Sequence, residues 1–281
     1  MQMPSRLGIL FNGAALLIVA ASTVAVFRST FLPDEMAACG TRYEHATQLS
    51  LERSRGELLT SADLQARSGG ADWGLLENAR IIETRNGPAK QAIEVRFMRT
   101  NTNAPAAESK MGMGFTWTPR NAGKAAAACL TYSVFMSKDF DFAKGGRLPG
   151  FVAATPDQDA TAAPVSSRVA WRDSGALELR VQMADWPEPR RLTGDKTYTL
   201  PRGQWVSLEQ EIVLNSPGAK DGLLRVWADG TMIFEKKNLA LREKPDTQVS
   251  GVLAEATLST VAGVSAPKDQ KMLLSPPELR W

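Results

Sequence analysis

Lys144 and Arg147 stand on either side of two glycines in the segment FDFAKGGRLPGF, residues 140–151. Arginine can grip a carboxylate with two parallel hydrogen bonds, and lysine can act as a point charge or, when its pKa is lowered, as a base. Glycine permits backbone conformations closed to other residues and lets a ligand come close to the chain. These residue types predict a cationic site for an acidic ligand, and the alternative is an ordinary basic turn at the surface.

A second group of polar side chains comes from two strand-like segments, residues 166–172 and 176–184. The turn signal Asp173-Ser174-Gly175 joins them, so we expect the two segments to pair as a hairpin. Successive side chains of a strand point to opposite faces, so the polar ones should merge into one patch. The expected members of this patch are Arg168, Arg172, Glu178, Arg180 and Gln182. The alternative is a solvated outer face that binds nothing.

These segments belong to a chain whose pattern is mostly that of strands. Many of its segments alternate apolar and polar residues and are separated by Gly, Pro, Asn and Asp turn signals. The strand-like segments are residues 79–85, 91–100, 111–119, 126–137, 166–172, 176–184, 204–215, 222–237, 251–260 and 271–279. Many short strands with little helix predict an all-β fold, a concanavalin-like β jelly-roll sandwich.

The N-terminus carries an apolar segment, residues 7–27, without a charged residue and bounded by Arg6 and Arg28. It is long enough to span a bilayer, so residues 1–28 are expected to be a signal peptide or a membrane anchor. Both predict export, to the periplasm, the membrane surface or the extracellular space. A buried core helix is the alternative. We expect a linker with a short helix over 29–70 and the jelly-roll domain over 71–281.

Composition limits the remaining possibilities. The net charge is +3 and no dense Lys/Arg tract occurs, so nucleic acid is not an expected partner. The two cysteines, Cys39 and Cys129, predict one disulfide in an exported protein, with two separate buried thiols as the alternative. Because His45 is the only histidine, we expect no metal site. No cofactor is expected, and nothing in the sequence indicates a structural calcium ion.

The segment ACLTYSVFMSKDFDFAKGGRLPGF resembles the signature CLxYxVYFPxxFDFVKGGKLPGL of the alginate and glucuronan lyase-like polysaccharide lyases. Three further blocks follow in the order of that family. They are SSRVAWRDSGALELRVQMAD, WVSLEQEIVLNSPGAKDGLLRVWADG and GVLAEATLSTVAGVSAPKDQKMLLSPPEL. The resemblance covers roughly residues 73–281, and four spaced blocks in order are much more specific than KGGR by itself.

The resemblance implies a β jelly roll with a face that holds an acidic polysaccharide and cuts it by β-elimination at a uronic acid. Such a reaction needs a base for the C5 proton, an acid for the leaving oxygen and cations for the uronate carboxylate. By matching positions, the candidate catalytic residues are Lys144, Tyr132 and Arg168. The candidate substrate-binding residues are Arg147, Ser166, Arg172, Arg180, Gln182 and Gln210. The membrane is a further partner if the N-terminal segment is not cleaved.

The chain departs from the family at one chemically important place. The family commonly has Tyr-x-Tyr where this chain has Arg180 and Gln182, and neither of these is a ready proton donor. A proton donor would have to be Tyr132, Tyr198, Lys144 or water. One alternative is therefore a catalytically impaired protein that binds acidic glycans or assists polysaccharide biosynthesis. Another is a glycoside hydrolase, but no spacing among Asp139, Asp141 and Glu178 singles out a carboxylate pair.

Overall fold

The computed structural model describes most of the chain beyond the N-terminal apolar segment. The described residues are 37–68, 72–99, 111–119, 122, 125–158, 163–194, 196–259 and 266–281. The signal peptide or anchor expected over 1–28 lies outside them. No helix among the described residues is long and apolar enough to cross a membrane. Residues Ala38–Trp281 form one compact unit, so the unit begins well before residue 71.

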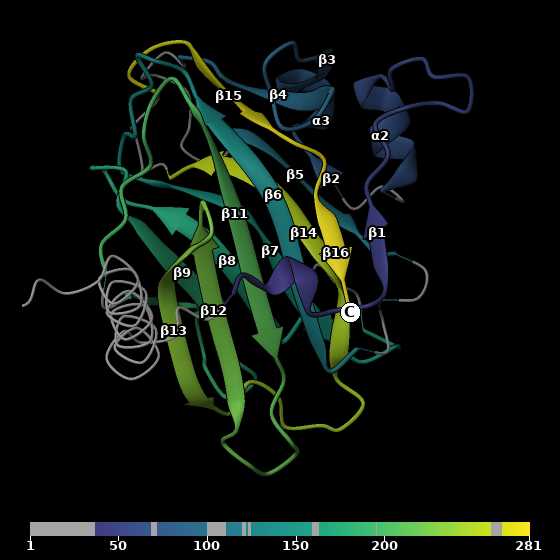
Figure 1. Ribbon diagram of the computed structural model, residues 1–281, viewed down its shortest axis with the longest axis vertical. Coiled ribbons are helices and arrows are strands. Elements are labelled where there is room, and N and C mark those ends of the chain that lie inside the picture. Colours follow the sequence, from purple (N-terminus) through teal and green to yellow (C-terminus); the bar gives the residue numbers. More distant parts are fainter. Residues whose placement is uncertain are drawn as a thin grey trace, which may run out of the picture. The chain divides into compact units, whose positions relative to one another are not determined.

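The described strands form two stacked antiparallel sheets, which confirms the expected all-β sandwich (Figure 1). The nine-stranded sheet runs β13 (Thr231–Leu239), β12 (Gly222–Ala228), β11 (Trp205–Val213), β6 (Ala127–Met136), β15 (Gln270–Leu274), β4 (Gln91–Phe97) and β3 (Ala79–Glu83), and β16 (Glu278–Arg280) pairs with β6 and with β1 (Ala46–Gln48). The seven-stranded sheet runs β10 (Arg190–Leu192), β9 (Leu177–Gln182), β8 (Val165–Trp171), β7 (Gly146–Ala154), β14 (Gln248–Leu258), β5 (Gly112–Trp117) and β2 (Asp72–Trp73). Both sheets send alternate side chains into the space between them.

The core fills the space between the sheets. From the nine-stranded sheet come residues such as Leu130 and Val134, and from the seven-stranded sheet come Val169 and Leu179, all buried. Burial of apolar side chains of this size provides most of the favourable free energy of folding. Helices are few among the described residues: α2 (Ser61–Arg67), α3 (Leu75–Asn78) and a short 3₁₀ turn, η1 (Cys39–Thr41). The core thus fixes which face of each strand is left for function.

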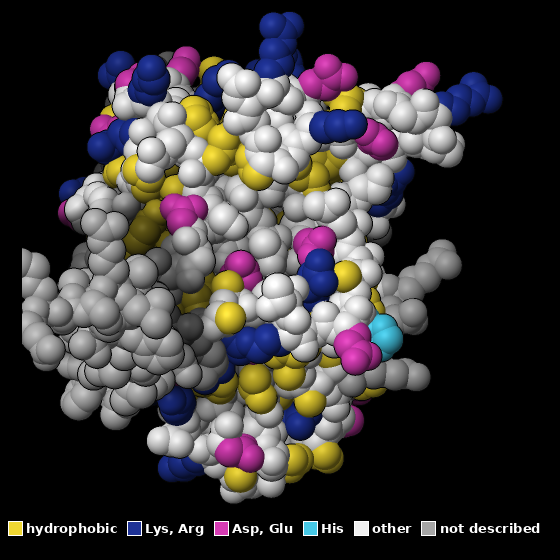
Figure 2. Space-filling view, viewed as in Figure 1, with side chains coloured by type: hydrophobic (Ala, Val, Ile, Leu, Met, Phe, Trp, Pro, Cys, Tyr) yellow, Lys and Arg dark blue, Asp and Glu magenta, His cyan; other side chains and the backbone are white. Residues whose placement is uncertain are grey.

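The segment around η1 crosses the outer face of the nine-stranded sheet, in front of β6 and β11 in Figure 1. A disulfide joins Cys39 to Cys129 on β6, which confirms the predicted pair. Arg42 lies 2.7 Å from Glu211 of β11 and stacks 5.1 Å above the Trp227 ring. Figure 2 shows this face, where acidic, basic and hydrophobic side chains are interspersed. Part of the segment expected to be a linker is therefore packed onto the domain.

Loss of the disulfide should lower stability without changing the fold. The bond closes a loop between residues 90 apart in sequence, and native disulfides of this kind contribute about 2–5 kcal/mol. We expect the double variant Cys39→Ser, Cys129→Ser to have a free energy of unfolding lower by about 2–5 kcal/mol, measured as a lower midpoint of urea unfolding. Reducing agent should shift the wild type toward the variant and leave the variant unchanged. Equal midpoints for both proteins under oxidising conditions would contradict the prediction.

Candidate functional site

The outer face of the seven-stranded sheet carries three arginines side by side on neighbouring strands. The β8–β9 hairpin, in the expected register, sets Arg168 directly opposite Arg180, and β10 sets Arg191 opposite Arg180 on the other side. Like charges directly opposite on neighbouring strands destabilise a sheet. Anions reduce the repulsion in such a row, and they come from the protein itself or from a ligand. We call this surface the arginine face; its members are Arg147, Arg168, Arg172, Arg180 and Arg191.

Glu255 on β14 supplies one of these anions. Its Oε1 lies 3.0 Å from Nη1 of Arg168 and 3.3 Å from Nε of Arg147, which also donates to the Thr257 hydroxyl at 3.2 Å. The Glu255 side chain is only 4% exposed. A buried charge is costly unless it is paired, so Glu255 needs these arginines to remain charged in the sheet. In return, its negative charge reduces the repulsion between them.

A glycine allows Arg168 to reach Glu255. Strand β7 lies between β8 and β14, so the arginine side chain has to cross it. Gly150 of β7 stands opposite Arg168. A Cβ at Gly150 would lie 2.8 Å from Cγ of Arg168 and 2.0 Å from the carbonyl oxygen of Ser167. The glycine of the LPG segment therefore keeps this path open.

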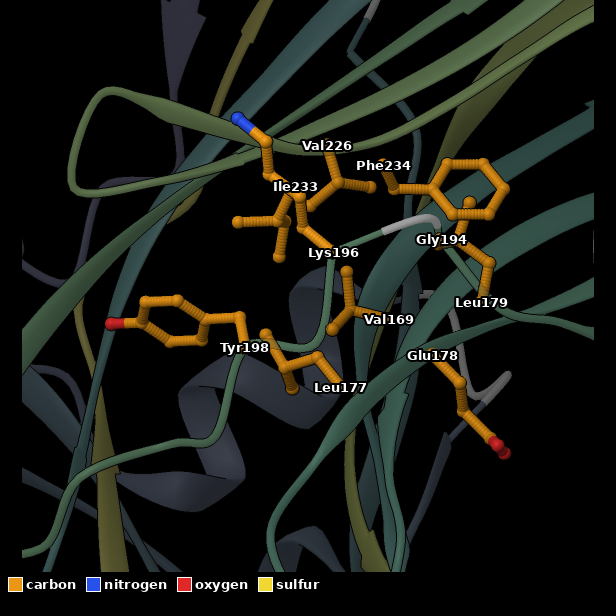
Figure 3. Close-up of a pocket in the computed structure, with 10 residues that line it drawn as sticks. All are labelled: Val169, Leu177, Glu178, Leu179, Gly194, Lys196, Tyr198, Val226, Ile233 and Phe234. Atoms are coloured by element: carbon orange, nitrogen blue, oxygen red, sulfur yellow. The ribbon is translucent and has the colours of Figure 1, made fainter.

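Glu178 on β9 supplies the second anion. Its side chain is 4% exposed, and its carboxylate lies 3.5 Å from Nε of Arg191 and 4.0 Å from Nε of Arg172. Figure 3 shows this carboxylate pointing away from the apolar side chains behind the sheet, such as Val226 and Phe234. The pocket among those side chains has an interior of about 10 Å³, room for one water molecule. It belongs to the core.

Arg180, in the middle of the row, is left without an anion. No residue that the structure describes forms an ion pair or hydrogen bond with its guanidinium. Its pKa is lowered, first by burial and then by the positive charges of Arg191, Arg147 and Arg168, while Glu178 acts in the opposite direction. Arginine nevertheless remains protonated at any physiological pH. The unrelieved repulsion marks a position where an anionic group of a ligand is favourable.

The two glycines of the KGGR turn serve packing. Gly145 has a φ of 110°, and a Cβ there would lie 2.4 Å from the carbonyl oxygen of Trp171. A Cβ at Gly146 would lie 2.1 Å from the Trp171 ring. The indole of Trp171 in turn donates to the Phe142 carbonyl at 3.2 Å. Gly145 thus has a backbone conformation of the kind expected for a glycine here, and both glycines let the start of β7 lie against a buried tryptophan.

Lys144 projects from this turn. The turn is fixed because the Gly145 N–H donates to the Phe142 carbonyl at 2.9 Å and the Ser259 N–H donates to the Gly145 carbonyl at 2.8 Å. The Lys144 side chain is exposed and makes no hydrogen bond or ion pair with any described residue. It lies three residues before Arg147 in the chain, in the turn that leads into β7.

Tyr132 and Gln210 are not brought to this face. Both lie between the sheets, where Tyr132 donates to the Pro149 carbonyl at 3.1 Å and Gln210 Nε2 donates to the same oxygen at 2.7 Å. Burial raises the pKa of Tyr132 well above its ordinary value. The pairing of β7 shifts register between Arg147 and Gly150, so the Pro149 carbonyl has no ladder partner. Tyr132 and Gln210 satisfy that carbonyl, which is a structural role.

The other two tyrosines of the chain also lie away from the arginine face. Tyr43 covers the nine-stranded sheet, where its hydroxyl donates to Glu211 at 3.0 Å. Tyr198 lines the core pocket of Figure 3 and donates to Asp229 at 3.2 Å; burial and then the Asp229 charge raise its pKa to about 12. All three tyrosines are described residues, so no tyrosine hydroxyl is available on this face.

Ser166 and Gln182 form the end of the β8–β9 hairpin, directly opposite each other. Ser166 is buried. The amide nitrogen of Gln182 donates to the carbonyls of Met183 at 2.9 Å and Trp186 at 2.7 Å, and Arg190 stacks 4.4 Å above the Trp186 ring. Gln182 therefore anchors the loop after β9, on the side of the face away from Arg172.

Sequence reasoning missed Glu255 and Arg191. Glu255 is a single acidic residue within the apolar run of β14, a pattern that itself signals a buried, paired charge. Arg191 belongs to a three-residue strand, too short for alternation to be recognised. Both became visible once strand order placed them beside the predicted arginines.

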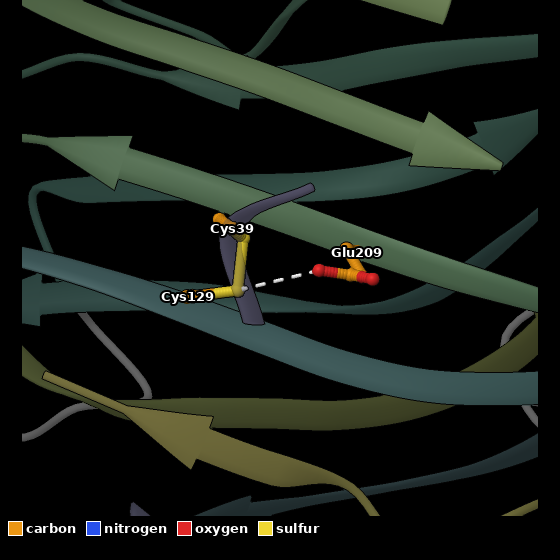
Figure 4. Close-up of side chains that lie close together, drawn as sticks. All are labelled: Cys39, Cys129 and Glu209. Atoms are coloured by element: carbon orange, nitrogen blue, oxygen red, sulfur yellow. Dashed lines mark hydrogen bonds between the residues drawn. A yellow bond between two sulfur atoms is a disulfide. The ribbon is translucent and has the colours of Figure 1, made fainter. Parts of the chain in front are cut away.

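On the nine-stranded sheet, Cys39, Cys129 and Glu209 approach one another (Figure 4). The Glu209 carboxylate accepts a hydrogen bond from the Gly40 N–H at 2.7 Å and lies 3.9 Å from the Cys129 sulfur. Because both sulfurs are joined in the disulfide, neither offers a thiolate to a metal ion. Glu209 holds η1 in place.

Comparison with known proteins relates this arrangement to a family. The family model described as polysaccharide lyase 14 matches residues 85–258, which confirms the resemblance seen in the sequence. A 112-residue segment is also 31% identical to UDP-N-acetylmuramoylalanine–D-glutamate ligase of Desulfitobacterium hafniense. That match covers 35% of this chain, and the chain spans only a quarter of the ligase (25%).

Solved structures share the fold at low identity. An alginate lyase from Aplysia kurodai is 17% identical with a TM-score of 0.65, covering 84% of this chain and 98% of that chain. An alginate lyase from Chlorella virus is 17% identical with a TM-score of 0.62, covering 83% and 98%. A glucuronan lyase from the fungus Trichoderma reesei is 14% identical with a TM-score of 0.51, covering 73% and 88%. These likenesses establish the sandwich fold.

Removing the Arg180 charge should stabilise the protein while weakening anion binding. Arg180→Met keeps an unbranched side chain and relieves cross-strand repulsion, so we expect a gain of a few tenths to about 1 kcal/mol in unfolding free energy. The gain should shrink at high salt. Arg55→Met, at an exposed arginine in a turn remote from this face, is the matched control. A loss of stability in Arg180→Met would show that the arginine is structural.

Proposed function

The chain belongs to the polysaccharide lyase 14 family, and on that premise we propose that it cleaves a uronate-containing acidic polysaccharide on the arginine face by β-elimination. The observation that carries the proposal is Arg180, a partly buried guanidinium among other arginines with no anion supplied by the described residues. A polymer with a carboxylate on each sugar supplies that anion. The similar solved structures include lyases of alginate and of glucuronan, which are uronate polymers.

The row of arginines suits recognition of such a polymer. Neighbouring strands are about 4.8 Å apart, so Arg168, Arg180 and Arg191 present positive charge along a line that crosses the strands. Two of the three are partly neutralised by buried carboxylates, and Arg180 keeps its full charge. A uronate carboxylate is thus best placed at Arg180, where a bidentate pair can form.

In the proposed reaction a base removes the proton from C5 of the bound uronate. The electron pair of that C–H bond forms the C4=C5 double bond, the C4–O4 bond breaks, and the leaving oxygen takes up a proton. Negative charge spreads onto the carboxylate as the C5 proton leaves. Arg180 and Arg168 stabilise this charge, and Glu255 holds Arg168 in position before the substrate binds.

Lys144 is the proposed proton-transfer group. The carboxylates of Glu178 and Glu255 are each engaged in ion pairs with two arginines. Lys144 lies in the turn that leads to Arg147 of this face, and its amine has no partner among the described residues. Within the KGGR turn, Arg147 is paired with Glu255, whereas the Lys144 amine contacts no described residue.

A second candidate function is binding without cleavage. It is favoured by one specific observation, that all three tyrosines lie away from the arginine face. In that case the protein would hold an acidic polysaccharide, for instance while the polymer is made or exported, and release it unchanged.

The two functions are separated by one assay on the full-length protein. We expect incubation with alginate or glucuronan to raise the ultraviolet absorbance of the unsaturated uronate product, and a neutral glucan to give no signal. Arg180→Gln should lower kcat/KM by about a hundredfold or more, as for loss of other fixed charges at a reacting centre. Lys144→Ala should abolish the signal.

Binding is measured in parallel by affinity electrophoresis in gels that contain the same polymers. Retention without product in the wild type would establish the binding function and refute cleavage. Retention should weaken with added salt and in Arg180→Gln, because the contact is between charges near the surface. Neither retention nor product on any uronate polymer would refute both functions.

We further infer that the domain works outside the cytosol, held by or released from the segment over residues 1–28. The Cys39–Cys129 disulfide supports this, because such bonds persist in oxidising compartments. Mass spectrometry of the mature chain after cell fractionation should find the protein in the envelope or medium. A fully cytosolic protein with reduced cysteines would contradict the inference.

A further inference from the structure

We propose a second carbohydrate-binding site, for a neutral saccharide segment, on the outer face of the nine-stranded sheet. A groove of about 560 Å³ lies there between the turn after β3 and the start of β11. This face is on the opposite side of the sandwich from the arginine face. The site goes beyond the proposed lyase reaction, which does not require it.

The floor of the groove is a row of apolar side chains across three neighbouring strands. Trp205 of β11 pairs with Phe135 of β6, and Phe135 pairs with Leu273 of β15. The two rings lie 5.6 Å apart between centroids, tilted by 49°. All three side chains are only partly buried. Figure 2 shows hydrophobic side chains gathered in the upper part of this face, where these strands meet the β3–β4 turn.

This row is unusual for the face it lies on. The neighbouring outward positions of the same strands hold Ser133, which is buried, and Ser207, which is partly buried. The two rings and the leucine are therefore larger and more apolar than the side chains next to them on this face. A contiguous apolar patch that includes partly exposed aromatic rings marks a candidate binding surface.

The turn after β3 holds Trp205 in one orientation. A Cβ at Gly87 would lie 3.2 Å from Cζ2 of the Trp205 ring and 2.7 Å from the Thr84 hydroxyl. The turn is itself closed by the Thr84 N–H, which donates to the Lys90 carbonyl at 2.8 Å. The ring is therefore supported along its edge before any ligand arrives, which reduces the entropy lost on binding.

Polar side chains surround the apolar floor. Glu83, Arg85 and Asn86 come from the β3 turn, and Gln204 precedes β11. All four are exposed, and none uses its side chain in a hydrogen bond or ion pair with a described residue. They offer both donors and acceptors that are free for a ligand.

An apolar floor with free donors and acceptors at its edge matches a sugar ring, which has C–H faces and a rim of hydroxyls. The volume of about 560 Å³ lies within the range of small-ligand sites. One glutamate and one arginine in the lining cancel in charge, so the groove does not favour a polyanion. We therefore assign it to a neutral segment, in contrast to the arginine face.

The test is calorimetric titration of the full-length protein with cellohexaose, a neutral β-1,4-linked oligosaccharide, at a salt concentration that weakens the arginine face. We expect saturable binding that salt leaves nearly unchanged. Trp205→Ala should weaken it about tenfold or more, whereas Trp205→Phe should retain most of it. Arg180→Gln should bind cellohexaose as the wild type does, which makes this result independent of the lyase proposal.

Because Trp205→Ala removes a partly buried ring, a second variant protects the test against misfolding. Asn86→Ala combined with Gln204→Ala changes only exposed side chains and should weaken binding several-fold at unchanged thermal stability. Absence of binding in the wild type would overturn the proposal. Binding that both variant proteins retain would overturn it too. So would self-association that depends on Trp205, which would assign the groove to a second copy of the chain.

Discussion

Mutual repulsion among arginines is the constraint on which the functional face depends. Arg168, Arg180 and Arg191 stand opposite one another on adjacent strands, where like charges oppose pairing. Two nearly buried carboxylates, Glu255 and Glu178, make this tolerable by each contacting two arginines. The compensation is incomplete at Arg180. A sheet that could be stabilised by a smaller charge instead keeps an excess of positive charge in one place, as anion-binding sites do.

The two outer faces of the sandwich have been made different by what covers them. On the nine-stranded sheet, η1 and its disulfide lie over β6 and β11, and Arg42 and Tyr43 both contact Glu211. The acidic residues of that face are thereby used internally. On the seven-stranded sheet, Glu255 and Glu178 each contact two arginines and reduce their repulsion. The guanidinium groups remain on the outer surface. Ion pairs between acidic and basic side chains therefore help to cover the outer face of the nine-stranded sheet, and they leave arginines accessible on the outer face of the seven-stranded sheet.

Much of this arrangement was predictable from local pattern, and the rest required strand order. The β8–β9 hairpin and its polar patch followed from alternation and a turn signal, and the disulfide followed from a pair of cysteines. Tyr132 was assigned to the site by resemblance, but β6 is apolar on its inner face and the tyrosine points inward. Alternation tells which residues share a face, and it does not tell which face is open.

The contribution of Glu255 could not be read from sequence for a different reason. It meets Arg168 across an intervening strand, through the space that Gly150 leaves, and neither the strand order nor that space is a local property. Likewise, the Pro149 carbonyl is exposed to Tyr132 and Gln210 only because β7 shifts register there. These are features of the assembled sandwich.

The link between Glu255 and Arg168 also bears on how the protein folds. The two residues are 87 positions apart in the chain, and Gln210 and Pro149 are 61 apart. Contacts between such distant segments form late and slowly, because the entropy of closing a long loop is lost before the contacts contribute favourable free energy. A partly folded chain could already pair Arg168 with Arg180 in the local β8–β9 hairpin, but it would lack the Glu255 contact that relieves their repulsion. The complete, charge-balanced arginine face is therefore a property of the finished sandwich and not of the isolated hairpin.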